Sequence, residues 1–211
     1  LRVPLAIGRW LPIGSLLMLI VFAITNHDIF HWTHEYLYDK SDPRYDYVID
    51  GKKAYLNLPF FLGRMVFFLG IWYLFYFLIL KHVAKEDENG GSESWKKLFT
   101  ISTIFVVFYA FSQSVAAWDW VLSIDTHWFS TMFGWYVFAS WWVSALALIT
   151  YMIILLKDNG YLSFVNHSVI HDLGKHVFAF SVFWTYIWFS QFLLIYYANI
   201  PEETIYFVER L

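Results

Sequence analysis

Residues 126–156, THWFSTMFGWYVFASWWVSALALITYMIILL, contain no Asp, Glu, Lys or Arg. A helix of about 20 predominantly apolar residues is long enough to cross the hydrocarbon core of a bilayer. This stretch exceeds that length, so we predict that it spans a membrane as an α-helix. Four other windows without these charges meet or approach the same length, the second of them only when Arg64 and the apolar residues before it are included: 10–27, 65–80, 98–118 and 176–201.

The composition of the whole chain supports the same fold class. Of its 211 residues, 59% are hydrophobic and 23% aromatic, while only 15% are charged, against about 25% in a soluble domain. We therefore predict an all-α integral membrane protein. Residues 1–211 form one transmembrane domain, a helical bundle, with five helices at about 4–25, 58–82, 95–118, 127–157 and 174–199.

Prolines and glycines refine these helices. Pro4 and Pro59 lie in the first turns of the first and second helices, where a missing N–H costs little. Pro12 and Gly14 predict a kink in the first helix, because Pro12 cannot bond back one turn. The chain opens inside an apolar run without a start methionine, and we expect it to be part of a longer protein.

Three of the four connections between the predicted helices lie at residues 26–56, 83–94 and 158–173; the fourth is the short gap at 119–126. In the long first connection, Asp50-Gly51 is a turn pair that favours a β-hairpin. Loop basic residues are enriched on the cytoplasmic side of membrane proteins. That rule places 83–94 and 158–173 in the cytoplasm and 26–56 in the periplasm, because the first side carries more basic residues. The first side has Arg2, Lys81, Lys85, Lys96, Lys97, Lys157 and Lys175, and the second has Lys40, Arg44, Lys52, Lys53 and Arg210.

Arg64 is the sharpest single signal for a site. It lies about five residues into its predicted helix, roughly 8 Å at 1.5 Å per residue. A charged residue in a span is costly and usually faces a partner or a wet cavity. Asp119 and Asp125 lie on the same predicted side, so pairing of Arg64 with one of them is one hypothesis. The alternative is that Arg64 reaches the lipid headgroups.

The two acids differ in their simplest explanation. Asp125 precedes the helix predicted from about residue 127 and is placed to cap it, whereas Asp119 follows a helix. Asp119 shares roughly one predicted helix face with Ser102, Tyr109, either Ser112 or Gln113, and Ala116. That stripe would carry water towards Asp119, or else it serves ordinary helix packing. His127 completes this outer polar cluster of Arg64, Asp119 and Asp125.

Two histidine-containing segments lie nearer the helix ends. Asp172, Lys175 and His176 cluster before the last predicted helix, on the inner side, and would collect protons there or form a solvated helix entry. His27, His31 and His34 share a face at i, i+4 and i+7 if the first helix continues. Such a face would ligate a metal or relay protons; the alternative is an interfacial turn of polar residues.

Some chemistry is excluded by residue type. The sequence has no cysteine, which rules out thiolate-ligated iron–sulfur clusters, cysteine-attached haem and disulfides within it. All eight histidines lie in predicted loops or near helix ends, an arrangement that disfavours a haem held by two histidines inside the membrane. No basic cluster is present that would bind nucleic acid.

Three aromatic-rich segments carry a family resemblance: WDWVLSIDTHWFSTMFGWYVFAS, GYLSFVNHSVIHDLGK and FWTYIWFSQFLLIYYANIPEETIYFV. They resemble the F-type membrane subunits of bacterial alternative complex III, within the wider NrfD-like, polysulfide-reductase membrane-subunit family. The resemblance runs from about residue 54 to residue 207. It implies a larger subunit of about ten helices, of which this chain would be a portion, in the bacterial inner (cytoplasmic) membrane.

The resemblance also implies a function. The parent complex oxidises quinol and passes electrons to a periplasmic acceptor such as cytochrome c. The implied partners are an iron–sulfur protein, multihaem and monohaem cytochrome c subunits, the related NrfD-like subunit and a terminal oxidase. Haem c and iron–sulfur clusters would reside in those partners. This subunit would contribute a quinone- or menaquinone-adjacent or proton-conducting polar path.

Two alternatives of other classes stay open. One is a membrane scaffold whose aromatic helices pack partner subunits without a site of their own. The other is an ion or solute transporter, which the kinked first helix and the buried arginine allow. Against the transporter, this sequence has no acidic or basic residue near the midplane of a predicted span, where such proteins usually carry one.

Overall fold

A computed structural model describes residues 2–89, 92–208 and 210, and the described chain is all-α. Within this described part of the chain, five helical segments are long and apolar enough to cross a membrane: Arg2–Ile29, Leu58–Glu88, Glu93–Ile124, Met132–Asp158 and His167–Ala198. The predicted fold class, an all-α multi-pass membrane protein, is confirmed. Grouped by their contacts, the residues form two compact units. The first unit is Gly8–His127, and the second is Trp128–Leu211 together with Leu1–Ile7.

The first spanning segment is broken near its start. Helix α1 (Arg2–Gly8) ends before Trp10, which is the N-cap residue of α2 (Leu11–Ile29). Pro12 lies in the first turn of α2, where its missing N–H breaks no helical bond. The predicted interruption is therefore present, but it lies before Pro12 and not at it.

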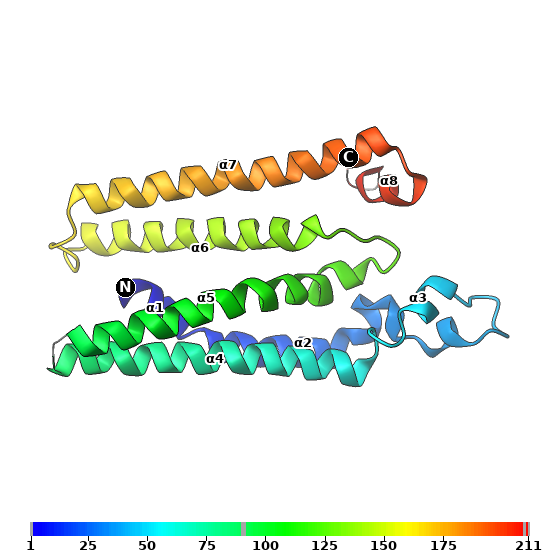
Figure 1. The fold of residues 1–211 in the computed structure, drawn as a ribbon, viewed down its shortest axis with the longest axis horizontal. Helices are drawn as coiled ribbons and strands as arrows, with labels where there is room; N and C mark the ends of the chain where they lie inside the picture. The colour runs from blue at the N-terminus through cyan, green and yellow to red at the C-terminus, as the bar shows by residue number, and fades with distance from the viewer. Residues whose placement is uncertain (1, 90–91, 209, 211) are drawn as a thin grey trace. The chain divides into compact units, whose positions relative to one another are not determined.

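In the first unit, α4 (Leu58–Asn89) and α5 (Ser92–Trp120) lie side by side (Figure 1). Their contact is aromatic, with Phe75 and Phe105 ring centroids 5.2 Å apart and those of Trp72 and Tyr109 5.4 Å apart. One buried polar contact fixes their register, because Trp72 Nε1 donates to Ser112 Oγ at 2.9 Å.

The connection between α2 and α4 is compact and helical. It holds the 3₁₀ turns η1 (His31–Thr33) and η2 (Glu35–Tyr38) and the short helix α3 (Tyr47–Gly51). The predicted β-hairpin at Asp50-Gly51 is wrong. Asp46 caps α3 by accepting from the backbone N–H groups of Val48 and Ile49, and this cap starts a helix where the turn pair favoured a hairpin.

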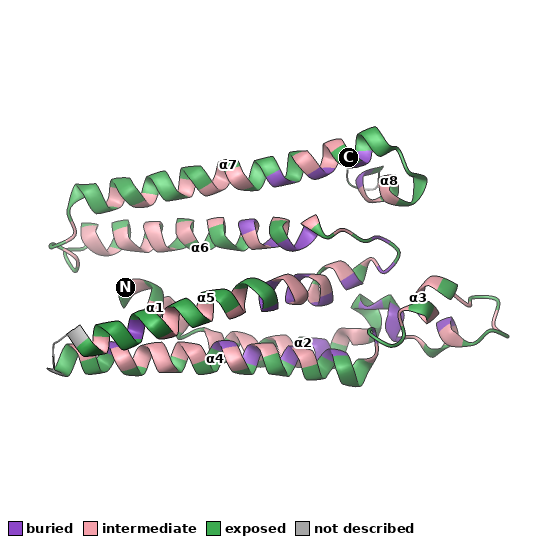
Figure 2. Ribbon diagram, viewed as in Figure 1, coloured by how far each residue is buried: buried purple, intermediate pink, exposed green. Residues whose placement is uncertain are grey.

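The core of the first unit joins this connection to the helices. Ile49 and Leu56 from the connection are buried with Phe61 and Met65 of α4 and with Phe22 of α2. Away from this core, the long helices carry exposed apolar residues along their length, and Figure 2 shows exposed positions along α5 and α7. Exposed apolar surface on this scale is expected of helices that face lipid.

In the second unit, α6 (Met132–Asp158) packs against α7 (His167–Ala198), and α8 (Pro201–Val208) folds back at the end of α7. The Tyr136 and Trp184 rings stack between the two long helices with centroids 6.0 Å apart. Trp128 stacks on Tyr206 of α8, with ring centroids 3.9 Å apart. A 3₁₀ turn, η3 (Leu122–Ile124), follows α5 in the first unit.

Candidate functional site: a covered ion pair at the end of α4 and α5

Arg64 and Asp119 form the candidate site. Arg64 lies in the second turn of α4, which Asn57 starts by accepting from the backbone N–H of Phe60 at 3.0 Å. Asp119 lies in the last turn of α5. Since α4 and α5 run in opposite directions, the start of one meets the end of the other, and the two side chains reach the same level.

The pair is bidentate and buried. Arg64 Nε donates to Asp119 Oδ2 at 2.6 Å, and Arg64 Nη2 donates to Asp119 Oδ1 at 3.0 Å. The side chains are 10% and 1% exposed, respectively. The predicted pairing of Arg64 with an acid is confirmed, and the acid is Asp119. Parallel charge-assisted bonds of this kind are among the strongest that a carboxylate accepts.

Tyr55 covers the pair from outside the span. Its backbone carbonyl accepts from Arg64 Nη1 at 3.1 Å, and its ring lies 3.9 Å from the guanidinium carbon. The Phe60 ring lies 4.3 Å from the same carbon. Burial raises the pKa of the Tyr55 phenol to about 12, and the nearby Asp119 carboxylate acts in the same direction through its charge and hydrogen bonding.

A second polar group joins the α2–α4 connection to the turn after α5. His127 Nε2 lies 2.6 Å from Asp46 Oδ2, and Lys52 Nζ donates to the carbonyl of Thr126. Burial lowers the pKa of the Lys52 ammonium, against the charges of Asp125 and Asp46, which raise it. We call these contacts the loop clamp, because they hold the connection that carries Tyr55 against the end of α5.

The structure separates the other predicted members of the outer cluster from the ion pair. His127 belongs to the loop clamp and is exposed. Asp125 does not cap a helix: it follows η3, and α6 begins only at Met132 with Thr131 at its N-cap. The prediction of an Asp125 cap is therefore wrong, because the chain makes an extra turn before α6 starts.

The predicted stripe on α5 is buried along much of its length. Ser112, Gln113, Ala116 and Asp119 are all buried. The Ser112 hydroxyl accepts from Trp72 and donates to the carbonyl of Phe108 at 2.9 Å. At Ser112, then, the stripe packs α5 against α4.

The inner cluster lies on α7 itself. Helix α7 starts at His167, capped by Asn166, so Asp172, Lys175 and His176 occupy its first turns and not the loop before it. Lys175 Nζ lies 3.1 Å from Asp172 Oδ1, and His176 Nδ1 lies 2.7 Å from the Asp172 carbonyl oxygen. All three are exposed, as a solvated helix entry would be.

The three histidines of the first connection do not share a helix face, because α2 ends at Ile29. His34 still lies near both others, with ring centroids 5.4 Å from His27 and 5.5 Å from His31. The ring nitrogens have protein contacts, His27 with the Thr33 hydroxyl and His34 with the His31 carbonyl. Among residues 2–89, 92–208 and 210, no three His, Cys, Asp or Glu side chains are arranged to hold a metal.

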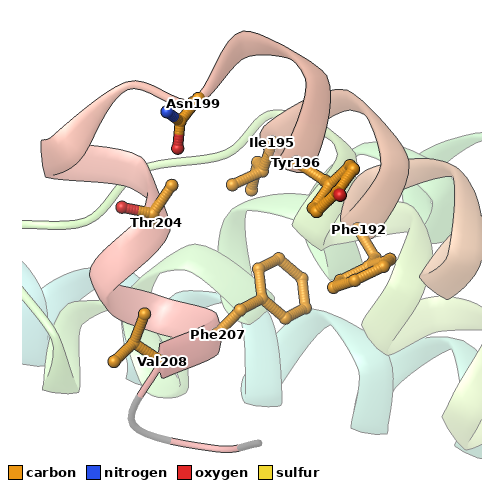
Figure 3. Close-up of a pocket in the computed structure, with 7 residues that line it drawn as sticks. All are labelled: Phe192, Ile195, Tyr196, Asn199, Thr204, Phe207 and Val208. Carbon is orange, nitrogen blue, oxygen red and sulfur yellow. The ribbon is translucent and has the colours of Figure 1, made fainter.

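One feature of the second unit was not predicted. A cavity of about 340 Å³ lies between the end of α7 and α8 (Figure 3). Its walls are mostly apolar, from Phe192, Tyr196 and Phe207, with Asn199 and Thr204 as polar members. The Asn-Ile-Pro break that ends α7 is the sequence signal for the reversal, since Asn199 takes the left-handed conformation there (φ 48°, ψ 39°).

In comparisons with known proteins, no family model and no curated sequence matches this chain significantly.

Proposed function

We propose that this chain is a membrane subunit of a quinol-oxidising electron-transfer complex of the bacterial inner membrane. In this role the Arg64–Asp119 pair belongs to a quinone-adjacent or proton-conducting polar site on the periplasmic side. The observation that supports the proposal is the buried, bidentate ion pair at the ends of two membrane-spanning helices. Ionisable groups within spans are expensive and usually mark ion or substrate pathways.

The surroundings of the pair support such a site. Gln113 and Ser112 extend the buried polar groups of α5 from Asp119 into the span. At the other end, Tyr55 connects the pair to the surface, because this residue is 40% exposed. Polar groups therefore lead from the surface to a carboxylate with apolar rings around it.

The redox centres of the proposed complex lie in its partners. The sequence has no cysteine to ligate an iron–sulfur cluster or attach haem c. The partners are then an iron–sulfur protein, cytochrome c subunits and a related membrane subunit, as the family resemblance implies. For a quinone itself, the α7–α8 cavity offers apolar walls beside the polar Asn199, the combination that small-ligand sites usually have.

The test is Asp119→Asn in the assembled complex. We expect lower quinol-dependent turnover or lower proton movement, because the amide cannot exchange a proton or keep the charge of the carboxylate. Asp42→Asn is the matched control, since Asp42 also pairs with an arginine but at an exposed position. Unchanged turnover and proton movement in a normally assembled Asp119→Asn complex would discard this site.

A scaffold without a site is the second candidate, and one observation favours it. Arg64 engages both oxygens of Asp119, so the pair also serves as a fixed tie between α4 and α5. In that case Asp119→Asn lowers the yield of assembled complex, while each complex that does assemble turns over normally. The two candidates thus differ in whether turnover per assembled complex changes.

A further inference from the structure

We propose that the Tyr55 side chain is a gate that controls the access of water to the buried Arg64–Asp119 ion pair. Tyr55 is a positioning residue in this role. The gate concerns water access alone, and its test measures no electron transfer. It can therefore hold or fail independently of the proposed function.

The first step of the argument is what covers the pair. Asp119 is almost fully buried and Arg64 nearly so. Phe60 and Phe61 also face the guanidinium, but both belong to α4, the helix that carries Arg64. Tyr55 lies outside the spanning segments and contacts the pair from the water side.

The second step is that the side chain can move while its backbone stays in place. The neighbouring Leu56 is buried in the core, and the Leu56 and Tyr55 N–H groups both donate to the carbonyl of Lys52. The Tyr55 carbonyl is held by Arg64. As a residue, Tyr55 is 40% exposed, so a rotation about its side-chain bonds would uncover the guanidinium without unfolding the connection.

The third step is the chemistry of the phenol. The hydroxyl is protonated at neutral pH, since the ordinary pKa of a tyrosine, 10.0, is well above 7 and burial raises the pKa of Tyr55 further. A protonated hydroxyl next to a carboxylate is a hydrogen-bond donor and adds no second negative charge. With the gate closed, the Tyr55 ring stacks on the Arg64 guanidinium, and the neutral hydroxyl adds no charge beside the Asp119 carboxylate.

The chain contains an exposed counterpart that serves as an internal control. Arg44 makes the same bidentate contact with Asp42, at 3.0 Å from Nε and 2.9 Å from Nη2, and its guanidinium carbon lies 4.0 Å from the Tyr36 ring. The Arg44 side chain is 65% exposed. Pairing and stacking are thus alike at the two arginines, while burial differs.

The experiment measures exchange of the arginine Nε–H protons with water by NMR. The full chain is labelled with ¹⁵N-arginine and placed in lipid nanodiscs. Its sequence has five arginines, and Arg64→Lys identifies the Arg64 signal. We expect slow exchange at Arg64 and fast exchange at Arg44. Tyr55→Ala should accelerate Arg64 exchange by about tenfold or more, because local opening then meets no cover.

Tyr55→Phe separates the ring from the hydroxyl, and we expect Arg64 exchange to stay slow in it. Tyr36→Ala is the matched control and should leave Arg64 exchange unchanged. Circular dichroism reports the fold of each variant, and Tyr55→Leu replaces Tyr55→Ala, with the same expectation, if the alanine variant does not fold. Unchanged exchange at Arg64 in Tyr55→Ala or Tyr55→Leu, or acceleration in Tyr55→Phe equal to theirs, would overturn the ring as the gate.

Discussion

Arg64 and Asp119 are 55 residues apart in the sequence and are joined by two hydrogen bonds, of 2.6 Å and 3.0 Å, between the start of α4 and the end of α5. Two separate ions would be costly in an apolar environment. The contact replaces them with one ion pair that has no net charge. Its two members are therefore expected to depend on each other energetically.

That dependence can be measured by a double-mutant cycle. Asp119→Asn leaves the Arg64 cation buried without a counter-charge, and we expect it to lower the free energy of unfolding by about 3–5 kcal/mol. Adding Arg64→Gln should recover part of this loss, since no unpaired charge remains. The measurement is SDS-induced unfolding in mixed micelles for the wild type, both single variants and the double variant. Additive losses, within about 0.5 kcal/mol, would contradict the coupling.

The bond from Trp72 to Ser112 gives a second prediction, inside the membrane. Ser112→Ala leaves the buried indole N–H of Trp72 without its acceptor. We expect a loss of about 1 kcal/mol in the free energy of unfolding, in the range measured for hydrogen bonds between membrane helices. The same loss in a Trp72→Phe background, where the donor is gone, would show that this bond is not its cause.

Acid should weaken the loop clamp through Asp46. Burial alone would raise the pKa of Asp46, but hydrogen bonds from the Ile49 N–H, from His127 and from the Val48 N–H outweigh it and lower the pKa below its ordinary value of 3.8. A carboxyl whose pKa is lower in the folded state stabilises that state above the ordinary value. This stabilisation is lost as the pH falls through the folded pKa.

The measurement for this prediction is the difference in Tm between the wild type and Asp46→Asn as a function of pH. We expect the wild type to be more stable near neutral pH and the difference to shrink below about pH 3.8. A difference that is constant from neutral to acidic pH would assign the effect of Asp46→Asn to something other than its charge.

The left-handed residue at the end of α7 gives a fourth prediction. Asn199 has φ 48°, a conformation that asparagine tolerates and glycine adopts freely. Asn199→Gly should leave the Tm unchanged or raise it slightly, whereas Asn199→Val should cost about 1–2 kcal/mol. Thermal unfolding of both variants tests this, and equal effects of the two would refute a backbone cause.

The spans were predictable because membrane insertion depends on properties that are local along the chain. The length without charges between Thr126 and Leu156 is sufficient by itself to require a helix, since every backbone group must be bonded within lipid. The helix ends were less predictable. The position of Asp125 predicts a cap, but the chain turns through η3 before α6 begins. The reversal at Asn199 is marked by the Asn-Ile-Pro break and not by the apolar pattern.

The position of Arg64 near a helix start also follows from sequence, and with it the hypothesis of an acidic partner. Which partner it takes does not. Asp119 and Asp125 lie at the same end, and the choice between them depends on how α5 is rotated about its axis against α4, which the Trp72–Ser112 contact and the aromatic packing determine.

Sequence alone therefore determined that this chain crosses a membrane, and that a cation near one end of a span either pairs with an anion or reaches the headgroups. Tertiary structure alone decided that Asp119 is that anion, that Tyr55 covers the pair, and that His127, 81 residues away, holds Asp46. The physical reason is how far apart in the sequence the interacting residues lie. Hydrophobic length and charge are properties of a segment, whereas these contacts arise only when packing brings distant segments into one register.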